Sequence, residues 1–174
     1  MESKFTYLRR KIFFIRRKFG LLPYQKIFRR LDRDIPDLYT WNALDIFAGD
    51  GEQSSLDMKK YINDIELWEN NPKCELSLKN KFPNSIVKIV DSYSEIDKVK
   101  KKFNIVLVDN WPRILSDHCE HFDLFPKILK IMKNRGVLII LTMPKINNKK
   151  LFSKEHLQLR SFFYSTDNSI DIPM

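Results

Sequence analysis

The stretch Ala43–Ser55, ALDIFAGDGEQSS, decides the fold because it joins three features in one short run. Apolar residues on both sides of Asp45 predict a buried strand, Gly49 and Gly51 predict a tight turn, and the polar residues after them predict the start of a helix. Glycine at such a turn lets the backbone approach a ligand that a Cβ atom would exclude. The run therefore has the layout of a nucleotide-binding turn.

From this turn onward, apolar runs with the pattern of strands alternate with amphipathic segments. The expected strands are 43–49, 64–69, 85–91, 104–109 and 137–143, and the expected helices are 54–63, 72–82, 93–103 and 121–133, with Gly136 as the turn before the last strand. Repeated strand and helix units of this size predict an α/β domain with a mostly parallel sheet between two helical layers. A ligand of such a sheet binds at the carboxyl ends of its strands. After the last strand, residues 144–174 leave room for a helix and one strand, so we expect a shortened C-terminal sheet edge.

The charge of the chain is concentrated at its beginning. The net charge is +9, and residues 1–40 hold 11 basic and 4 acidic residues, which is 11 − 4 = +7 of that total. Apolar residues in this segment are three or four positions apart and predict one stripe along a helix: Phe5, Leu8, Ile12, Ile15, Phe19 and Leu22. We therefore divide the chain into a basic amphipathic helical extension, residues 1–40, and a domain, residues 41–174.

The basic extension indicates an anionic partner, either a membrane surface or nucleic acid, although its apolar stripe is equally compatible with packing on the domain. The chain has no apolar run of about 18 residues or more and no signal-peptide pattern, so we expect a cytoplasmic protein, with peripheral membrane attachment as one form of the partnership. Cys74 and Cys119 are too few for a disulfide scaffold and lack the spacing of a zinc site.

Four of the five expected strands end in residues suited to hold a ligand. The candidate ligand-binding residues are Asp45, Phe47, Ala48, Gly49 and Gly51 at the first strand, Glu69 at the second, Asp91 and Ser92 at the third, and Asp109, Asn110 and Trp111 at the fourth. A carboxylate such as Glu69 can accept hydrogen bonds from both hydroxyls of a vicinal diol, which is how a protein fixes a ribose. Asp45 has acceptors for the turn or for the ammonium end of a ligand.

Across residues 42–143 this set of motifs resembles that of the class I S-adenosylmethionine-dependent methyltransferases, which have a Rossmann-like fold. The resemblance implies that S-adenosylmethionine is the cofactor. It implies that the residues around the glycine turn bind this cofactor, that Glu69 binds its ribose hydroxyls, and that Asp91 and Ser92 contact its adenine ring. It also implies that Asp109 faces the methyl group and the substrate.

The methyl acceptor is less closely defined. Asp109 is the first candidate for a general base, and His121 is the second because an imidazole titrates near neutral pH. The run from Asp109 to Pro112, DNWP, partly resembles the D/N-P-P-Y/F motif of enzymes that methylate exocyclic amines, which makes Asn110 and Trp111 candidates for substrate binding. It departs from that motif because the tryptophan precedes the only proline. We expect no metal, since the local spacing fixes no third ligand beside His118 and His121.

The function that fits best is methyl transfer to an acceptor of unknown identity, either an anionic glycan, lipid-linked or small molecule, or RNA. A non-catalytic scaffold on the same fold is the second hypothesis, with the shortened sheet edge recruiting a partner or a second copy as a homodimer. An NAD(P)-dependent oxidoreductase is the third. It fits poorly, because Ser54 occupies the third glycine position of the dinucleotide fingerprint and Asp45 lies inside the strand.

Overall fold

The computed structural model describes residues 22–52, 54–109 and 124–140. The strands are β1 (Asn42–Asp45), β2 (Asp64–Glu69), β3 (Ile86–Ile89), β4 (Phe103–Val108) and β5 (Met132–Ile140). The α-helices are α2 (Pro23–Asp34), α3 (Ser54–Met58), α4 (Glu75–Lys81), α5 (Ser92–Glu95) and α7 (Phe125–Ile131), and the short 3-10 helices are η1 (Leu38–Thr40), η2 (Pro72–Cys74) and η3 (Ile96–Lys98).

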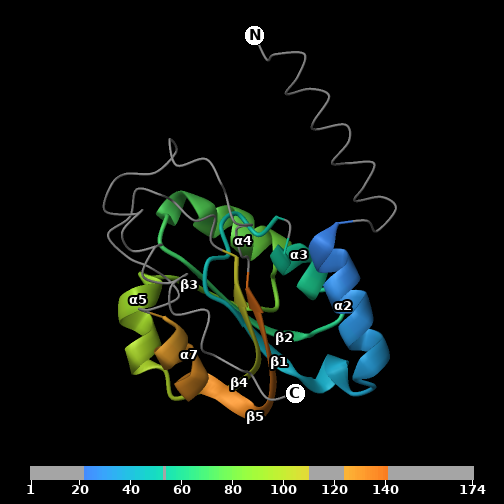
Figure 1. The fold of residues 1–174 in the computed structure, drawn as a ribbon. Coiled ribbons are helices and arrows are strands. Elements are labelled where there is room, and N and C mark those ends of the chain that lie inside the picture. The colour runs from blue at the N-terminus through green and yellow to red at the C-terminus, as the bar shows by residue number, and fades with distance from the viewer. Residues whose placement is uncertain (1–21, 53, 110–123, 141–174) are drawn as a thin grey trace, which may run out of the picture.

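The five strands form one sheet in the order β3-β2-β1-β4-β5, and every pairing is parallel. β1 lies in the middle, so its last residue, Asp45, pairs with Leu67 of β2 on one side and with Leu107 of β4 on the other. Helices cover both faces of the sheet (Figure 1). The predicted α/β fold with a parallel sheet between two helical layers is confirmed.

Alternate residues of the strands point to opposite faces and form two apolar cores. On one face Ala43, Leu67 and Leu107 pack with residues of α2, α3 and α4, and on the other face Leu44 and Val106 pack with residues of η3 and α7. The strands of such a sheet are buried on both sides, which explains their continuous apolar runs. The carboxyl ends of β1, β2 and β4 are thereby held in place from both faces.

Two asparagines tie the amino ends of β1 and β4 together. The backbone NH of Asn42 donates to Oδ1 of Asn104 (3.3 Å), and the backbone NH of Asn104 donates to Oδ1 of Asn42 (3.1 Å). Oδ1 of Asn104 also accepts from Nζ of Lys133 (2.9 Å), and its Nδ2 donates to the carbonyl of Arg135 (2.9 Å). One buried side chain thus joins three neighbouring strands.

We expect Asn104→Ala to lower the free energy of unfolding by about 2 kcal/mol, because the substitution leaves the buried Asn42 NH and the part-buried Arg135 carbonyl without their partner. Chemical denaturation measures this difference. Asn84→Ala, at an exposed position, is the control and should leave stability within about 0.5 kcal/mol of wild type. Equal stabilities of the two variants would contradict the structural role of Asn104.

The prediction that Gly136 forms a turn before the last strand is wrong. β5 begins at Met132, five residues earlier than expected, and Gly136 lies inside it. The pairing of β4 with β5 shifts register between Phe103 and Ile105, and a Cβ atom at position 136 would lie 2.8 Å from the backbone oxygen of Asn104. The glycine therefore permits a close approach of two strands at a bulge, which a sequence does not distinguish from a turn.

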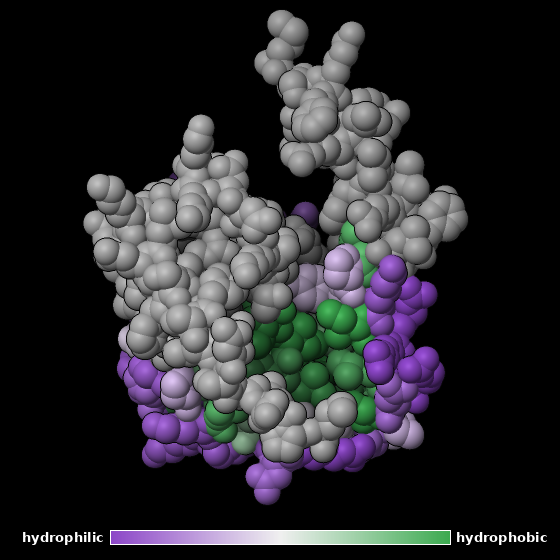
Figure 2. Space-filling view, in the orientation of Figure 1, coloured by the Kyte–Doolittle hydropathy of each residue, from purple (hydrophilic) through white to green (hydrophobic). Residues whose placement is uncertain are grey.

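The end of the predicted extension shares the core of the domain. Phe28 of α2 and Leu38 of η1 are buried in the same cluster as the strand residues on that face, and α2 packs on α3. The opposite side of α2 carries exposed cations, and Figure 2 shows this hydrophilic side next to hydrophobic residues in the centre of the same view. The amphipathic stripe of residues 5–19 and the expected C-terminal sheet edge lie outside the described residues. Within the described ranges, no helix is long and apolar enough to cross a membrane.

Candidate functional site

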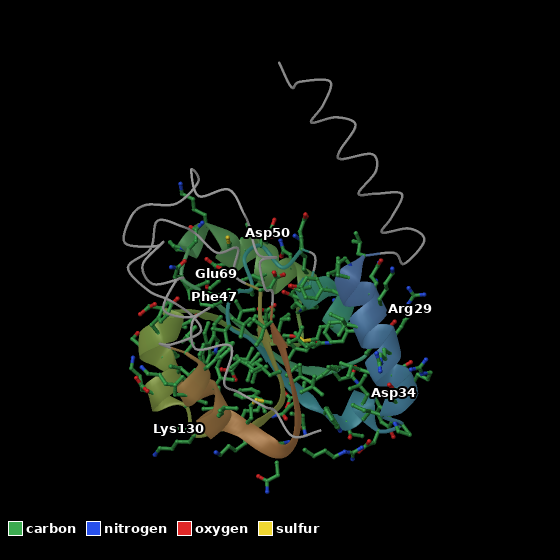
Figure 3. The ribbon with its side chains drawn as sticks, in the orientation of Figure 1. Arg29, Asp34, Phe47, Asp50, Glu69 and Lys130 are labelled. Atoms are coloured by element: carbon green, nitrogen blue, oxygen red, sulfur yellow. The ribbon has the colours of Figure 1, made fainter. Side chains whose placement is uncertain are left out.

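Strand register brings three carboxylates to one face of the sheet. Glu69 follows Leu67 by two positions and Asp109 follows Leu107 by two, and both leucines pair with Asp45. Side chains two positions apart in a strand share a face, so Asp45, Glu69 and Asp109 all lie on the α2–α3 side. Figure 3 shows Glu69, Phe47 and Asp50 at this end of the sheet, with Lys130 at the opposite end.

Asp45 is completely buried beneath the turn. Its Oδ2 accepts a hydrogen bond from Oγ of Ser55 (2.6 Å), and its Oδ1 accepts one from the backbone NH of Phe47 (3.2 Å). Burial raises the pKa of the Asp45 carboxyl to about 7; the Ser55 and Phe47 hydrogen bonds oppose this rise, and the charges of Asp109 and Glu69 add to it. A positively charged ligand would therefore favour ionisation of Asp45 at neutral pH.

The Glu69 carboxylate holds the glycine turn. Its Oε2 accepts a hydrogen bond from the backbone NH of Gly49 (2.9 Å), and its Oε1 accepts one from the backbone NH of Asn71 (2.8 Å). Each oxygen of a carboxylate has two lone pairs, so both keep an acceptor site for a ligand hydroxyl. The group expected to bind the ribose is thus fixed in place and still able to accept a diol.

The glycine turn needs both of its glycines, for different reasons. Gly49 and Gly51 have φ angles of +56° and +77°, a backbone region that favours glycine. A Cβ atom at Gly51 would lie 2.6 Å from Cε2 of Phe82, whereas a Cβ atom at Gly49 would have no atom within 4 Å. Open space therefore lies above Gly49, where a ligand can approach the backbone. Gly51 instead packs against Leu78 of α4 and against Phe82, which follows that helix.

Two side chains behind the turn fix its outer edge. The carbonyl of Asp50 accepts hydrogen bonds from Oγ of Ser77 (3.0 Å) and from Nζ of Lys81 (2.8 Å). Both donors belong to α4, the helix that also packs against Gly51. The loop between β1 and α3 is therefore held from the Glu69 side and from the α4 side.

The candidate adenine residues lie at the start of α5. Oδ1 and Oδ2 of Asp91 accept from the backbone NH groups of Tyr93 (3.4 Å) and Ser94 (3.2 Å), so Asp91 caps the helix. Oγ of Ser92 donates to the carbonyl of Ile46 (2.6 Å) and joins α5 to the end of β1. The ring of Tyr93 lies 6.1 Å from the ring of Phe47, measured between centroids. Contacts of these residues with a cofactor stay predictions.

The other candidates divide between the described and the undescribed parts of the chain. Ala48 is buried in the turn, and its NH donates to the carbonyl of Trp68 (2.9 Å). Asp109 directly follows β4, close enough for its charge to act on Asp45. Asn110, Trp111 and His121 lie outside the described residues. Among the residues that are described, no three His, Cys, Asp or Glu side chains form a group that would hold a metal ion.

Comparison with known proteins identifies solved structures of similar fold. No protein-family model matches the chain, and no curated protein matches it in sequence. An S-adenosylmethionine-dependent methyltransferase from Archaeoglobus fulgidus, 19% identical, superposes with a TM-score of 0.53 over 87% of this chain and 72% of its own. The N-methyltransferase NodS from Bradyrhizobium japonicum, 10% identical, has a TM-score of 0.52 over 80% of this chain and 82% of its own. The chain has the same fold as these two methyltransferases.

A conserved hypothetical protein from Streptococcus pyogenes, 15% identical, also superposes, with a TM-score of 0.50 over 61% of this chain and 72% of its own. At identities this low, the three matches establish the fold alone, because one fold can carry many different chemistries. In this methyltransferase fold the three carboxylates lie at the strand ends where a ligand of a parallel sheet binds.

Two residues of the candidate site were not predicted from the sequence. Ser55 holds the buried Asp45, and a serine ten positions after a strand acid carries no sequence signal for that contact. Tyr24 of α2 has a buried hydroxyl, and burial together with the charges of Asp109 and Asp45 raises its pKa above the usual range of tyrosine. Tyr24 precedes the strand by many residues, in the segment assigned to the extension, so only the packing of α2 brings it to the site.

Proposed function

We propose that the chain is an S-adenosylmethionine-dependent methyltransferase whose cofactor lies over the glycine turn and whose methyl acceptor is held near Asp109. The observation that carries this proposal is Glu69, whose carboxylate is fixed by the Gly49 NH and keeps acceptor sites for a diol. The methyltransferase fold supports it. The cofactor supplies a methyl group on a positively charged sulfur, so the protein mainly binds and aligns the two reactants.

The residues at the strand ends fit this cofactor. Open space above Gly49 leaves room for a ligand close to the backbone. Glu69 would accept the two ribose hydroxyls, and Asp45, once ionised, would attract the ammonium end. Phe47 and Tyr93 would offer apolar rings beside the adenine position, with Asp91 and Ser92 at the start of the same helix.

We propose in addition that the basic residues of the extension hold an anionic portion of the acceptor or of its carrier. Within the described part of the chain, α2 contributes Lys26, Arg29, Arg30 and Arg33 to its exposed side (Figure 2). Arg30 and Arg33 lie 3.5 Å and 2.8 Å from the carboxylate of Asp34. Asp34 and the exposed Asp32 reduce but do not cancel the positive charge that these four cations give to the helix. A phosphate-bearing glycan or lipid fits such a surface.

The test of the cofactor site is isothermal titration calorimetry with S-adenosylhomocysteine, the product form of the cofactor. We expect wild-type protein to bind it and Glu69→Ala to weaken binding about tenfold or more, which corresponds to about 1 to 3 kcal/mol for a lost charged hydrogen-bond partner. Glu75→Ala, which removes an exposed acid of α4 paired with Lys79, is the matched control and should bind as wild type does.

Two further measurements separate the competing functions. Glu69→Gln keeps one oxygen acceptor, so it tests whether the effect of Glu69→Ala arises from lost ligand contact or from a disordered turn. Thermal unfolding of each variant reports on the stability of the turn. NAD(H) in place of S-adenosylhomocysteine should give no heat. Binding of NAD(H) alone would show an oxidoreductase, and no binding of either compound would contradict the proposed methyltransferase.

A further inference from the structure

The hydroxyl of Tyr24 is a buried polar group that lies beside the Asp109 carboxylate without a hydrogen bond of normal geometry to it. Tyr24 lies in the first turn of α2, and its ring packs against the core on the α2–α3 face of the sheet. Its oxygen is buried and makes no hydrogen bond of normal geometry with any described residue. Buried hydroxyls in proteins are nearly always hydrogen-bonded, so this one is a candidate for contact with a bound molecule.

The charges nearest to this hydroxyl are carboxylates. Burial and the neighbouring Asp109 and Asp45 raise the pKa of Tyr24 above its usual range, so the hydroxyl keeps its proton at neutral pH. A neutral hydroxyl can donate one hydrogen bond and accept others through its oxygen. Tyr24 can thus donate toward Asp109 while its oxygen receives an N–H group from a ligand.

This end of the site attracts positive charge. The charges that act most strongly on Asp45 are those of Asp109 and Glu69, and both are negative. Carboxylates that face one another without a cation between them are unfavourable, and a ligand cation relieves that repulsion. The local field therefore favours a cationic group over a phosphate or a carboxylate at the reacting position.

The order of the strands places this group relative to the ribose position. β2, which ends in Glu69, and β4, which precedes Asp109, lie on opposite sides of β1. A ligand whose diol is held by Glu69 crosses the glycine turn and extends toward Asp109 and Tyr24. We propose that Tyr24 and Asp109 form the acceptor end of the site and that they take a protonated amine nitrogen.

This inference rests on the proposed function and narrows its acceptor to an amine. In this arrangement Asp109 and the Tyr24 oxygen each accept an N–H bond from the ammonium group. The Asp109 carboxylate then takes one proton from the nitrogen, which leaves a neutral amine with a free lone pair and a protonated Asp109 that returns its proton to water. The basic side of α2 remains available for an anionic portion of the same acceptor molecule.

Two ligands that differ at one position test the inference. In sinefungin a carbon bearing an amine replaces the methylated sulfur of S-adenosylmethionine, so its charged nitrogen stands in for the transferred methyl group, next to the acceptor position. S-adenosylhomocysteine has an uncharged thioether there. By isothermal titration calorimetry we expect wild-type protein to bind sinefungin at least about tenfold more tightly. Tyr24→Phe removes a single oxygen, and we expect it to weaken sinefungin about tenfold and S-adenosylhomocysteine less than about twofold.

The control is Tyr39→Phe, which makes the same change at an exposed tyrosine of η1 and should alter neither affinity. Thermal unfolding of both variants verifies that they fold. Equal affinity of wild-type protein for the two ligands, or an equal loss of both in Tyr24→Phe, would overturn the inference and leave the proposed function standing. Binding of neither ligand to wild-type protein would overturn both.

Discussion

Gly51→Ala is expected to lower the free energy of unfolding by about 2 to 5 kcal/mol. Part of this loss is backbone strain, because the φ angle of +77° costs a residue with a Cβ atom about 1 to 2 kcal/mol. The rest is overpacking, since the new Cβ atom would lie 2.6 Å from Cε2 of Phe82 and 3.0 Å from Cδ2 of Leu78, at a cost of about 1 to 3 kcal/mol. Both neighbours are buried in the core and have little room to move.

Gly49→Ala is the matched control for this prediction. Its φ angle of +56° gives a similar backbone cost, but its Cβ atom would meet nothing within 4 Å. Chemical denaturation should therefore show a loss of about 1 to 2 kcal/mol for Gly49→Ala, smaller than that for Gly51→Ala. By calorimetry, Gly49→Ala should weaken S-adenosylhomocysteine binding more than Gly51→Ala does, because the new methyl group at position 49 points into the open space where the ligand would lie. Equal losses of stability would show that contact with Phe82 has no part in the requirement for glycine.

Asp45→Asn is expected to make the protein more stable than wild type at pH 8 by on the order of 4 kcal/mol. The carboxyl has a pKa of about 7 in the folded protein and 3.8 as its ordinary value, a gap of about 7 − 3.8 = 3.2, and each pH unit corresponds to about 1.4 kcal/mol. Between these two values the folded state holds a proton that the unfolded state releases. Stability therefore falls as the pH rises through this window and is level above about pH 7.

Asparagine is neutral at every pH and has the size of the protonated acid, so the variant should lack this fall. Denaturation of both proteins at pH 5 and pH 8 measures the effect, and the gain in stability of the variant should be smaller at pH 5 by about 2 to 3 kcal/mol. Asp64→Asn, at an exposed aspartate paired with Lys101, is the control and should retain the wild-type slope. Parallel pH dependence of wild type and Asp45→Asn would contradict the shifted pKa of Asp45.

The same substitution should lower the affinity for the cofactor that the proposed function requires. Ionised Asp45 attracts an ammonium group, so wild-type affinity for S-adenosylhomocysteine should rise between pH 6 and pH 8, with protons released on binding. The asparagine variant should bind more weakly and show no such rise. A gain in stability together with a loss of affinity would mark Asp45 as a residue kept for binding.

The sequence predicts the central strands β1, β2 and β4 well because they are buried on both faces. Residues 105–108 of the expected strand 104–109 are all apolar, and the strand 64–69 is observed over the residues expected. Helices are less well bounded: the segment 54–63 forms a helix only at Ser54–Met58. An amphipathic pattern shows which side of a segment is buried, whereas the hydrogen bonds that end a helix depend on tertiary neighbours.

The candidate site follows the same division. Asp45, Glu69 and Asp109 are predictable because a parallel sheet brings its strand ends to one edge. Tyr24 and Ser55 are not predictable in this way, since Tyr24 reaches the site through the packing of α2 and Ser55 through the position of α3. Gly136 illustrates the same limit, because a glycine that admits a neighbouring strand and a glycine that reverses the chain look alike in a sequence.

The two hydrogen bonds that Glu69 accepts from Gly49 and Asn71 bear on the entropy of binding. A free glutamate side chain loses rotational freedom when a ligand immobilises it, at a cost of about 1.5 to 2 kcal/mol. Here the protein meets that cost during folding, before any ligand arrives. A diol that reaches Glu69 therefore meets a preorganised acceptor, and more of its interaction energy remains available as affinity.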